Sequence, residues 1–503
     1  MTKKLLVLLL CLAMLVSIAA CTPQDTTSET PSADDGSTES SEVSDDGNPK
    51  FPFEAKKYDT TIRILCVAQE RHTYGELQFV PDEDSSFGQI SDAVAARNDI
   101  IEEKYGIKFE VVPSTTPQTE LELAMKSASG SDMPFELVSN TVCTMLPYAT
   151  ENYFLPLNDV LHLENEWWDQ NAIETLAVTD DIYFVAGDCM VTDDEYCYCI
   201  LYNKDIYEQN QEIKAQFGDL YQLVDDGKWI YDALYTMAKA VTQPDENGKL
   251  GTVNCTYGLL SDGYSTEMIV LGSGSTTARK IGKGNFEISI GERTAVDAFG
   301  KVFEICTDTG ATILVDKVPE SWEGIANMFI SGRGLFKTSV VQSISDIKSD
   351  TAEKKVNFGV LPMPKYTVEQ ENYYSGINVY QTEVMAIPSF NNKGATLEAT
   401  ACALEALGYY SRYSAGESVS HAYYETTLKS QAMPDEEDER MLDMVVSNRL
   451  YDIGTIYNWG DIIQVWASII RSGNNTLSSQ LDSVKTKAET AMNETIDKYN
   501  TMG

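Results

Sequence analysis

The sequence has very little histidine and lacks the short motifs of common enzyme classes. Only three histidines occur in 503 residues, and none stands in the HExxH spacing of zinc peptidases. The GxSxG of serine hydrolases, the GxGxxG of dinucleotide-binding proteins and a glycine-rich loop ending in Gly-Lys-Ser/Thr are all absent. A pair of catalytic carboxylates is still an alternative in so acidic a chain, but no sequence pattern selects such a pair. We therefore predict no enzyme, no cofactor and no metal site.

Basic residues and long apolar runs are scarce as well. The chain has 37 Lys and Arg against 77 Asp and Glu, a formal net charge of −40. A negative field of this size repels nucleic acid, so we predict no nucleic-acid partner. No apolar run reaches the ~20 residues that an uncleaved membrane span needs.

The N-terminus has the pattern of a secretory signal peptide. Lys3 and Lys4 precede an apolar run from Leu5 to about Val16, and small residues then lead to Cys21. The residues before Cys21 resemble the lipobox of bacterial lipoproteins. That resemblance implies cleavage after residue 20 and acylation of Cys21, for instance with palmitate. The alternative is an ordinary signal peptide with a chance cysteine.

A polar segment follows the predicted lipidation site. Residues 22–50 are mostly Thr, Ser, Asp, Glu, Gly and Pro, and such a composition cannot bury enough apolar surface to order itself. We predict a disordered tether over 21–58, which holds a globular body on the extracytoplasmic face of the cell membrane.

The remaining cysteines are widely spaced, unlike a dense disulfide scaffold. Cys197 and Cys199 lack the two-residue spacing of zinc ligands. If 183–191 and 195–202 form a hairpin around Asp193-Asp194, Cys189 lies near that pair. A disulfide of Cys189 with Cys197 or Cys199 and free buried thiols are the two alternatives.

Hydrophobic patterning predicts alternating strands and helices. Strands are expected at 60–67, 107–111 and 135–139, with helices over 90–105 and 117–128 between them. This order implies a parallel sheet flanked by helices, with ligands beyond the carboxyl ends of its strands.

A second α/β region begins after 183–188, and the chain closes with a long amphipathic helix. Its expected elements are helices at 231–241, 295–307 and 322–330, and strands at 334–339 and 356–361.

Several stretches resemble the extracellular solute-binding proteins of sugar-type ABC importers, the maltodextrin-binding protein family. The order and spacing of these stretches carry the resemblance, because each motif is short. They are Leu201–Tyr207 (the family's YNKDL), Gly227–Leu234 (W-T-W-D-E-L), Met328–Phe336 (F-x-x-G-x-x-A-M), Asn357–Lys365 (GVxPLPK) and Gly376–Phe390 followed by Asn391-Asn392-Lys393 (the return to the first lobe).

The resemblance implies a two-lobed, periplasmic-binding-protein-like α/β fold, each lobe a mainly parallel sheet flanked by helices. Lobe 1 would take 59–187 and 373–412, and lobe 2 would take 188–372 and 413–503. Hinge crossings are expected near Gly187-Asp188, Tyr373-Tyr374 and Arg412. Extra sequence near 157–182 and 413–450 departs from the family, so ligand identity does not carry over.

The same resemblance implies a function in binding. A monomeric lipoprotein would capture a small polar ligand, an oligosaccharide first of all, between its lobes and deliver it to ABC transporter permease subunits. The alternatives are a lipoprotein enzyme that acts on glycans and a ligand sensor that is not coupled to transport.

Candidate ligand contacts follow from these expectations. Trp459 matches a late aromatic position that stacks on sugar in the family, with packing as the alternative. Gln69, Glu70 and Arg71 follow the first strand, and an exposed loop is their alternative role.

Further candidates lie near strand ends and crossings. Asn140 and Thr141 follow the third strand, where they either contact ligand or cap the next helix. Asp188, Tyr196 and Tyr374 lie at predicted crossings. Trp322 either faces ligand or packs its helix onto lobe 2. Trp167-Trp168 either rims the cleft or packs at the surface, and Trp229 is expected in the core.

Overall fold

The computed structural model describes residues 47–82, 84–127, 133–349, 356–391, 394–414, 418–424 and 436–502. Residues 51–503 form one compact unit. The predicted signal peptide, Cys21, most of the tether and Asn392-Lys393 lie outside the described residues. Within the described ranges, none of the helices combines the length and apolar character needed to cross a membrane.

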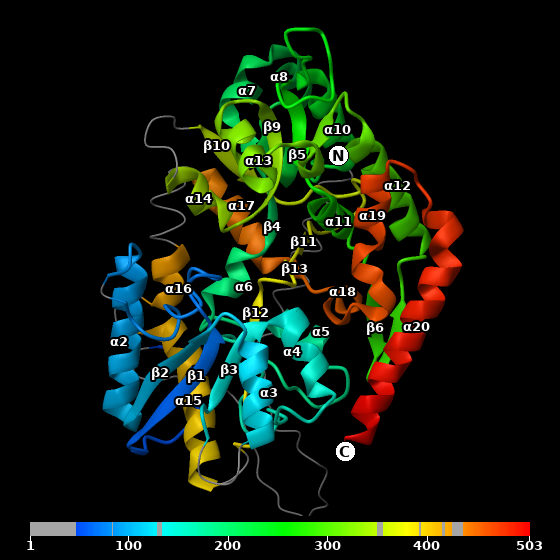
Figure 1. The fold of residues 1–503 in the computed structure, drawn as a ribbon. Coiled ribbons are helices and arrows are strands. Elements are labelled where there is room, and N and C mark those ends of the chain that lie inside the picture. Colours follow the sequence, from blue (N-terminus) through cyan, green and yellow to red (C-terminus); the bar gives the residue numbers. More distant parts are fainter. Residues whose placement is uncertain are drawn as a thin grey trace, which may run out of the picture. The chain divides into compact units, whose positions relative to one another are not determined.

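The first β-sheet has four strands in the order β12-β3-β1-β2 (Figure 1). Strand β1 pairs in parallel with β2 and β3, whereas β12 comes from much later in the chain and pairs antiparallel with β3. All five residues of β3 are buried, as expected for an interior strand covered on both faces. The strands are β1 (Thr60–Val67), β2 (Ile107–Ser114), β3 (Leu137–Thr141) and β12 (Glu383–Ala386).

Helices cover this sheet in the predicted β-α-β-α-β order, which the structure confirms. Helix α2 is capped by Gly106, whose left-handed backbone (φ 64°) lets its N–H donate to Glu102 O. Helix α15 packs on α2 and on β1. The helices are α2 (Gly88–Tyr105), α3 (Pro117–Ser127), α4 (Val142–Ala149) and α15 (Gly394–Tyr413).

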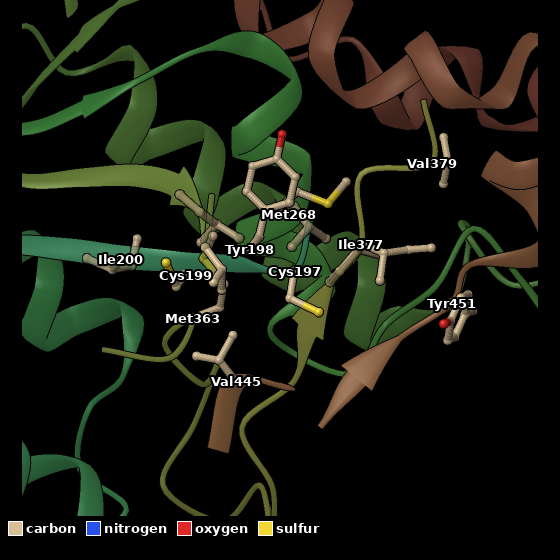
Figure 2. Packing of buried hydrophobic residues seen from close by; sticks show 14 of the residues in the cluster. Cys197, Tyr198, Cys199, Ile200, Met268, Met363, Ile377, Val379, Val445 and Tyr451 are labelled. Carbon is tan, nitrogen blue, oxygen red and sulfur yellow. The ribbon is translucent and has the colours of Figure 1, made fainter. Parts of the chain in front are cut away.

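The second sheet has five strands in the order β10-β4-β9-β5-β8. Strand β5 is parallel to β8 and β9, but β4 runs antiparallel to both β9 and β10, so the sheet is mixed. Side chains of β4 pack in the core near Met268, Met363 and Val445 (Figure 2). The strands are β4 (Tyr198–Asn203), β5 (Tyr257–Ser261), β8 (Thr312–Leu314), β9 (Gly334–Val340) and β10 (Phe358–Leu361).

The helices and strands predicted for this second region are confirmed, with boundaries moved by a few residues. Other helices here were not predicted, because their apolar residues do not repeat over a long enough window. The helices around the second sheet are α7 (Lys204–Gln209), α8 (Gln211–Phe217), α9 (Leu220–Asp225), α10 (Tyr231–Val241), α11 (Gly263–Leu271), α12 (Arg293–Thr307), η1 (Val315–Lys317), α13 (Ser321–Ile330), α14 (Ser343–Ser349) and α17 (Glu436–Ser447).

Short elements connect the two sheets. The hairpin considered around Asp193-Asp194 is not formed, because these residues lie in a helical turn, α6 (Val191–Glu195). Cys189, Cys197 and Cys199 are free, as are the other five cysteines from Cys66 to Cys402. Strand β11 (Ser375–Gly376) pairs in parallel with β13 (Arg449–Leu450), and α16 (Val419–His421) packs on α2 and α15.

The last part of the chain packs around the predicted long C-terminal helix, which is confirmed as α20. Ala488 and Tyr499 are buried on it as the pattern requires. Its closest packing partner is η3, the element that begins at Trp459. The elements are α5 (Gln170–Leu176), β6 (Ala278–Gly282), β7 (Asn285–Ile288), α18 (Ile453–Tyr457), η3 (Trp459–Gln464), α19 (Val465–Ser472) and α20 (Leu477–Thr501).

Candidate functional site

Two pockets stand out in the described part of the chain. One has a volume of about 560 Å³, and we call it the tyrosine pocket. The other has a volume of about 690 Å³, and we call it the aspartate pocket. The tyrosine pocket is lined chiefly by Tyr198, Tyr264, Trp322, Lys337, Tyr380 and Gln464. The aspartate pocket is lined chiefly by Asp188, Asp193, Asp194, Arg412, Tyr423 and Arg449.

The tyrosine pocket lies at the carboxyl ends of two parallel strands of the second sheet. Tyr264 and Ser265 follow β5, where the Asp262 carboxylate accepts hydrogen bonds from both of their backbone N–H groups at 2.7 and 3.0 Å. Thr338 to Val340 end β9 and also line the pocket. This is the edge at which open α/β sheets bind ligands.

A turn that precedes β12 of the first sheet contributes the opposite part of the lining. Asn378, Tyr380 and Gln381 belong to this turn. Backbone hydrogen bonds hold it against the carboxyl end of β3: Val142 N–H donates to Thr382 O at 2.8 Å, and Cys143 N–H donates to Val379 O at 3.3 Å. The pocket therefore gathers residues that belong to both sheets.

Aromatic rings form a row in this pocket. The ring centroids of Tyr198 and Tyr264 are 6.2 Å apart, and those of Tyr264 and Tyr380 are 5.7 Å apart. Trp322 is 57% exposed and lines the same pocket. The Tyr264 hydroxyl is buried and has no hydrogen-bond partner among the described residues. Burial raises its pKa, and the nearby Val379 backbone acts in the opposite direction.

Polar groups between the rings are mostly uncharged. The described lining includes amides of Asn378, Gln381 and Gln464 and several hydroxyls, and it has no carboxylate. Lys337 is the one cation in that lining, and its Nζ donates to Ser339 Oγ at 2.7 Å. Aromatic faces beside amides and hydroxyls suit a neutral, hydroxyl-rich ligand.

The ligand contacts predicted after strands of the first sheet are not among the residues that line this pocket. Gln69, Glu70 and Arg71 are exposed, and Arg71 donates to Thr115 O at 2.8 Å. Asn140 and Thr141 are buried, and the Asn140 side chain accepts a hydrogen bond from Thr141 N–H at 2.8 Å.

Cys143 links these residues to the tyrosine pocket. Burial raises its pKa, and the positive charge of Arg71 acts in the opposite direction. Burial likewise raises the pKa of Tyr380, and Cys143 adds to that increase. The Thr141 hydroxyl is 3.8 Å from Cys143 Sγ. Arg71 and Thr141 therefore lie near the turn that carries Tyr380.

The residues predicted at the crossings are placed apart from one another. Asp188 lines the aspartate pocket and pairs with Arg412 at 2.9 Å. Tyr196 is fully buried, with its ring 5.6 Å from that of His72. Tyr374 is half-buried and its ring lies against Gly274.

Trp459 lies outside the lining of both pockets. It is 2% exposed, its ring stacks on Tyr457 at 5.3 Å, and its indole N–H donates to Thr495 Oγ1 at 2.9 Å. It begins η3, however, and Gln464 at the other end of η3 reaches the tyrosine pocket.

Trp167, Trp168 and Trp229 are buried like Trp459. Trp229 is fully buried as predicted, and its indole N–H donates to Pro362 O at 2.8 Å. The expectation that Trp167 and Trp168 lie at the surface is wrong, because both are at most 2% exposed and both donate to the buried Glu405 carboxylate.

The row of tyrosines was not predicted. The apolar residues of 257–261 are not spaced in a way that distinguishes a strand from a helix or a loop. The sequence therefore did not show that Tyr264 follows the end of a strand. Tyr380 and Gln464 reach the same pocket from segments far apart in the sequence.

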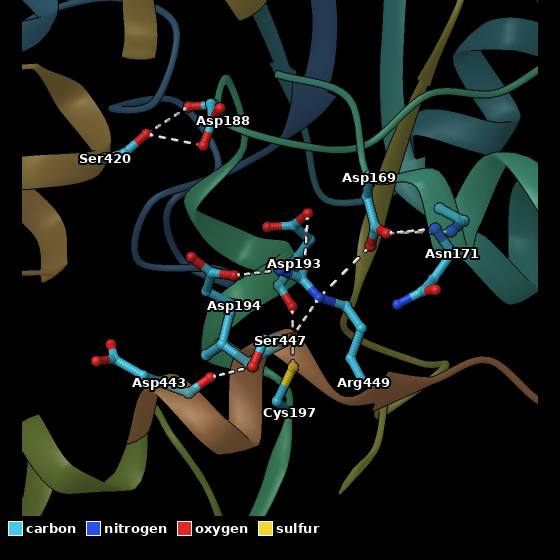
Figure 3. A network of polar contacts seen from close by, with 12 residues as sticks. Asp169, Asn171, Asp188, Asp193, Asp194, Cys197, Ser420, Asp443, Ser447 and Arg449 are labelled. Atoms are coloured by element: carbon cyan, nitrogen blue, oxygen red, sulfur yellow. Dashed lines mark hydrogen bonds and ion pairs between the residues drawn. The ribbon is translucent and has the colours of Figure 1, made fainter. Parts of the chain in front are cut away.

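The aspartate pocket is built around one guanidinium (Figure 3). Arg449 Nη1 lies 2.8 Å from Asp193 Oδ2, Nη2 lies 2.8 Å from Asp194 Oδ1, and Nε lies 3.4 Å from Asp169 Oδ2. Burial raises the pKa of Asp194 to about 6, with Arg449 opposing the shift. We call Arg449 and these three aspartates the arginine hub.

The comparisons with known proteins bear on the fold. No family model and no curated protein sequence matches the chain. Among solved structures, the sugar-binding protein MalE of Xanthomonas citri superposes with a TM-score of 0.56 at 13% identity, over 88% of this chain and 99% of that one. A cyclo/maltodextrin-binding protein complexed with maltotetraose superposes with a TM-score of 0.54 at 15% identity, over 88% of this chain and 98% of that one. This chain has the two-lobed fold of sugar-binding proteins.

A third structure agrees with this assignment. The maltose-maltodextrin-binding protein of Alicyclobacillus acidocaldarius superposes with a TM-score of 0.50 at 13% identity, over 87% of this chain and 100% of that one. The fold expected from the sequence resemblance is therefore confirmed. In the two-lobed fold, the tyrosine pocket is the one at the carboxyl ends of parallel strands.

Proposed function

We propose that this protein is an extracytoplasmic solute-binding lipoprotein that captures a small polar ligand, an oligosaccharide first of all, and delivers it to an ABC transporter permease. One observation carries the proposal. A row of aromatic rings with interleaved amides lies at the carboxyl ends of β5 and β9 and beside the turn before β12. Aromatic faces stack on the C–H faces of sugars, and amides bond to sugar hydroxyls.

The proposed lobes are those expected from the sequence, 59–187 with 373–412 and 188–372 with 413–503. A ligand that contacts both the β5–β9 edge and the turn at Asn378 would favour the closed arrangement by its differential affinity for that state. The protein would act as a monomer that presents its loaded form to the permease.

Binding is favoured over hydrolysis by the chemistry of the lining. Glycosidases use two carboxyl groups that flank the scissile bond. The described residues that line the tyrosine pocket include no carboxyl group. A glycan-acting enzyme would therefore need its carboxylates at another place.

Trp322 provides the most direct test of the ligand pocket. Replacing it by alanine should weaken oligosaccharide binding about tenfold to a hundredfold, because a ring covered by ligand contributes about 1.5–3 kcal/mol. Isothermal titration of maltodextrins and other oligosaccharides into wild type and Trp322→Ala measures the change. Ile281→Ala, an equally exposed apolar residue on β6, is the matched control.

Fluorescence supplies an independent readout. The chain has six tryptophans, and Trp322 is 57% exposed while the other five are at most 2% exposed. Acrylamide should quench Trp322 preferentially, and bound oligosaccharide should protect it. Equal oligosaccharide affinity of Trp322→Ala and wild type would remove Trp322 from the ligand site.

The lipid anchor is tested at its own residue. Cys21→Ala should prevent acylation, so the protein should leave the membrane fraction and take up no labelled palmitate. Cys11→Ala changes a cysteine inside the predicted signal peptide and should leave both properties intact. Membrane retention of Cys21→Ala would contradict the proposed anchor.

Transport and sensing are separated in cells. A deletion strain should lose uptake of the labelled ligand if the protein serves a permease. Normal uptake with a lost transcriptional response to the ligand would instead assign the protein to sensing.

A further inference from the structure

The aspartate pocket holds more carboxylates than cations. Arg449 pairs with three carboxylates and Arg412 with two. When all five are ionised, these carboxylates exceed the two guanidinium groups by three negative charges, and Asp443 is a sixth carboxylate in the same lining. The five carboxylates are Glu166, Asp169, Asp188, Asp193 and Asp194.

Burial makes this excess costly. The side chains of Asp193 and Asp169 are 3% and 6% exposed. Burial raises the pKa of Asp188 and of Asp193, and the two guanidinium groups offset only part of that shift. A buried carboxylate without a full counter-charge is stabilised by any cation that reaches it.

Tyr423 provides a second and independent observation. Its side chain is 2% exposed, it lines the same pocket, and its hydroxyl has no hydrogen-bond partner among the described residues. The carboxylates of Glu195 and Asp194 are close enough to raise its pKa, after burial as the main cause. Buried hydroxyls are nearly always hydrogen-bonded in native proteins, so an unpartnered one on a residue that lines a pocket points to a missing ligand.

We propose that the aspartate pocket binds an organic cation that carries protonated amines. The carboxylates accept hydrogen bonds from the ammonium groups, and the Tyr423 hydroxyl bonds to a further polar group of the ligand. A bare metal ion fits less well, because no three potential metal ligands of the described chain stand close enough together to hold one. A volume of about 690 Å³ also suits a small molecule.

The site is separate from the proposed oligosaccharide site, since the two pockets share no lining residue. Its carboxylates come from the segment before α5, from the chain just after Gly187 and from α6. A cation bound there would therefore contact the segments that connect the two sheets.

The decisive variant is Tyr423→Phe in the full mature chain. Spermidine and putrescine, titrated at pH 8, should bind the wild type and raise its melting temperature. Tyr423→Phe should weaken that binding at least tenfold. Because the hydroxyl removed has no partner in the described part of the chain, the variant should fold and should melt no lower than wild type without ligand.

Two further proteins complete the experiment. Tyr235→Phe, which removes a buried hydroxyl on α10 outside both pockets, should bind amines like wild type. Asp188→Asn removes one carboxylate charge and should also weaken amine binding. Oligosaccharide binding to Tyr423→Phe should be unchanged, which separates this inference from the proposed function.

Two results would overturn the inference. One is the absence of any amine response at pH 8. The other is equal amine binding by wild type and Tyr423→Phe that vanishes in high salt, which would assign the effect to nonspecific attraction by the −40 charge of the chain.

Discussion

Replacing Arg449 by methionine should lower the free energy of unfolding by about 3–5 kcal/mol at pH 8, the usual effect of removing one partner from a buried ion pair. Arg449 is the only cation within ion-pairing distance of Asp193 and Asp194 among the residues described, and its side chain is 13% exposed. Methionine fills similar volume, so the loss reports charge rather than a cavity. Chemical denaturation measures it.

The loss should depend on pH in a definite direction. Burial raises the pKa of Asp194 from 3.8 to about 6 and raises that of Asp193 well above its usual value. A raised folded pKa stabilises the protein below the unfolded pKa, and this contribution is lost as pH rises through about 6. The ionised form of Asp194, which needs Arg449, is therefore populated above pH 6. The effect of Arg449→Met should be larger at pH 8 than at pH 5.

Arg440 is the matched control for this charge removal. It also pairs with two carboxylates, Asp225 and Glu437, but its side chain is 42% exposed. Exposed pairs contribute about 0–1 kcal/mol because water and salt screen them. If Arg449→Met and Arg440→Met had the same free energy of unfolding, the arginine hub would not stabilise the segments that connect the two sheets.

Replacing Trp459 by alanine should destabilise the protein by about 3–5 kcal/mol, the range for truncating a buried tryptophan. The substitution removes the stacking on Tyr457, the contact with Phe286 at 5.8 Å and the hydrogen bond to Thr495. Gly460 follows in a left-handed conformation with α20 against it, so the turn has little freedom to refill the space. Thermal and chemical denaturation measure the loss.

Trp322→Ala is the control for this tryptophan, because a residue 57% exposed contributes little to folding. Comparing these two variants also tests whether the oligosaccharide binds at Trp322 or at Trp459. At a temperature where both variants are folded, Trp322→Ala should weaken oligosaccharide binding more than Trp459→Ala. The reverse order would assign the stacking role to Trp459.

The two pockets differ in the chemistry of their linings. The tyrosine pocket has rings and amides and suits neutral hydroxyl-rich ligands, whereas the aspartate pocket has buried carboxylates and suits amines. The titrations with oligosaccharides and with amines therefore test each pocket without the other.

Local patterns predicted the elements that have a clear period. The strand at 60–67, the helix capped by Gly106 and the long C-terminal helix follow from apolar spacing and a glycine cap, which are properties of neighbouring residues. The turn at 191–195 was not predicted as a helix, because its two aspartates are held by Arg449, more than two hundred residues later.

The candidate site was predicted only in part. Trp322 and Asp188 each line a pocket, but they line different ones. Tyr264 and Tyr380 escaped notice because nothing in the sequence relates the residue after β5 to the turn before β12. Their proximity arises from pairing between β3 and β12 and from packing around β4 and β9.

The sequence by itself determined the predicted secretion signal, the acidic character and the α/β succession, since each depends on composition or on contacts a few residues apart. The order of motifs along the chain also indicated the two-lobed fold. Only the tertiary structure decided which aromatic residues meet in a pocket and which tryptophans are buried. It also decided that one arginine, Arg449, forms ion pairs with three aspartates. Those outcomes depend on strand pairing and side-chain packing between residues hundreds of positions apart, and no local pattern encodes them.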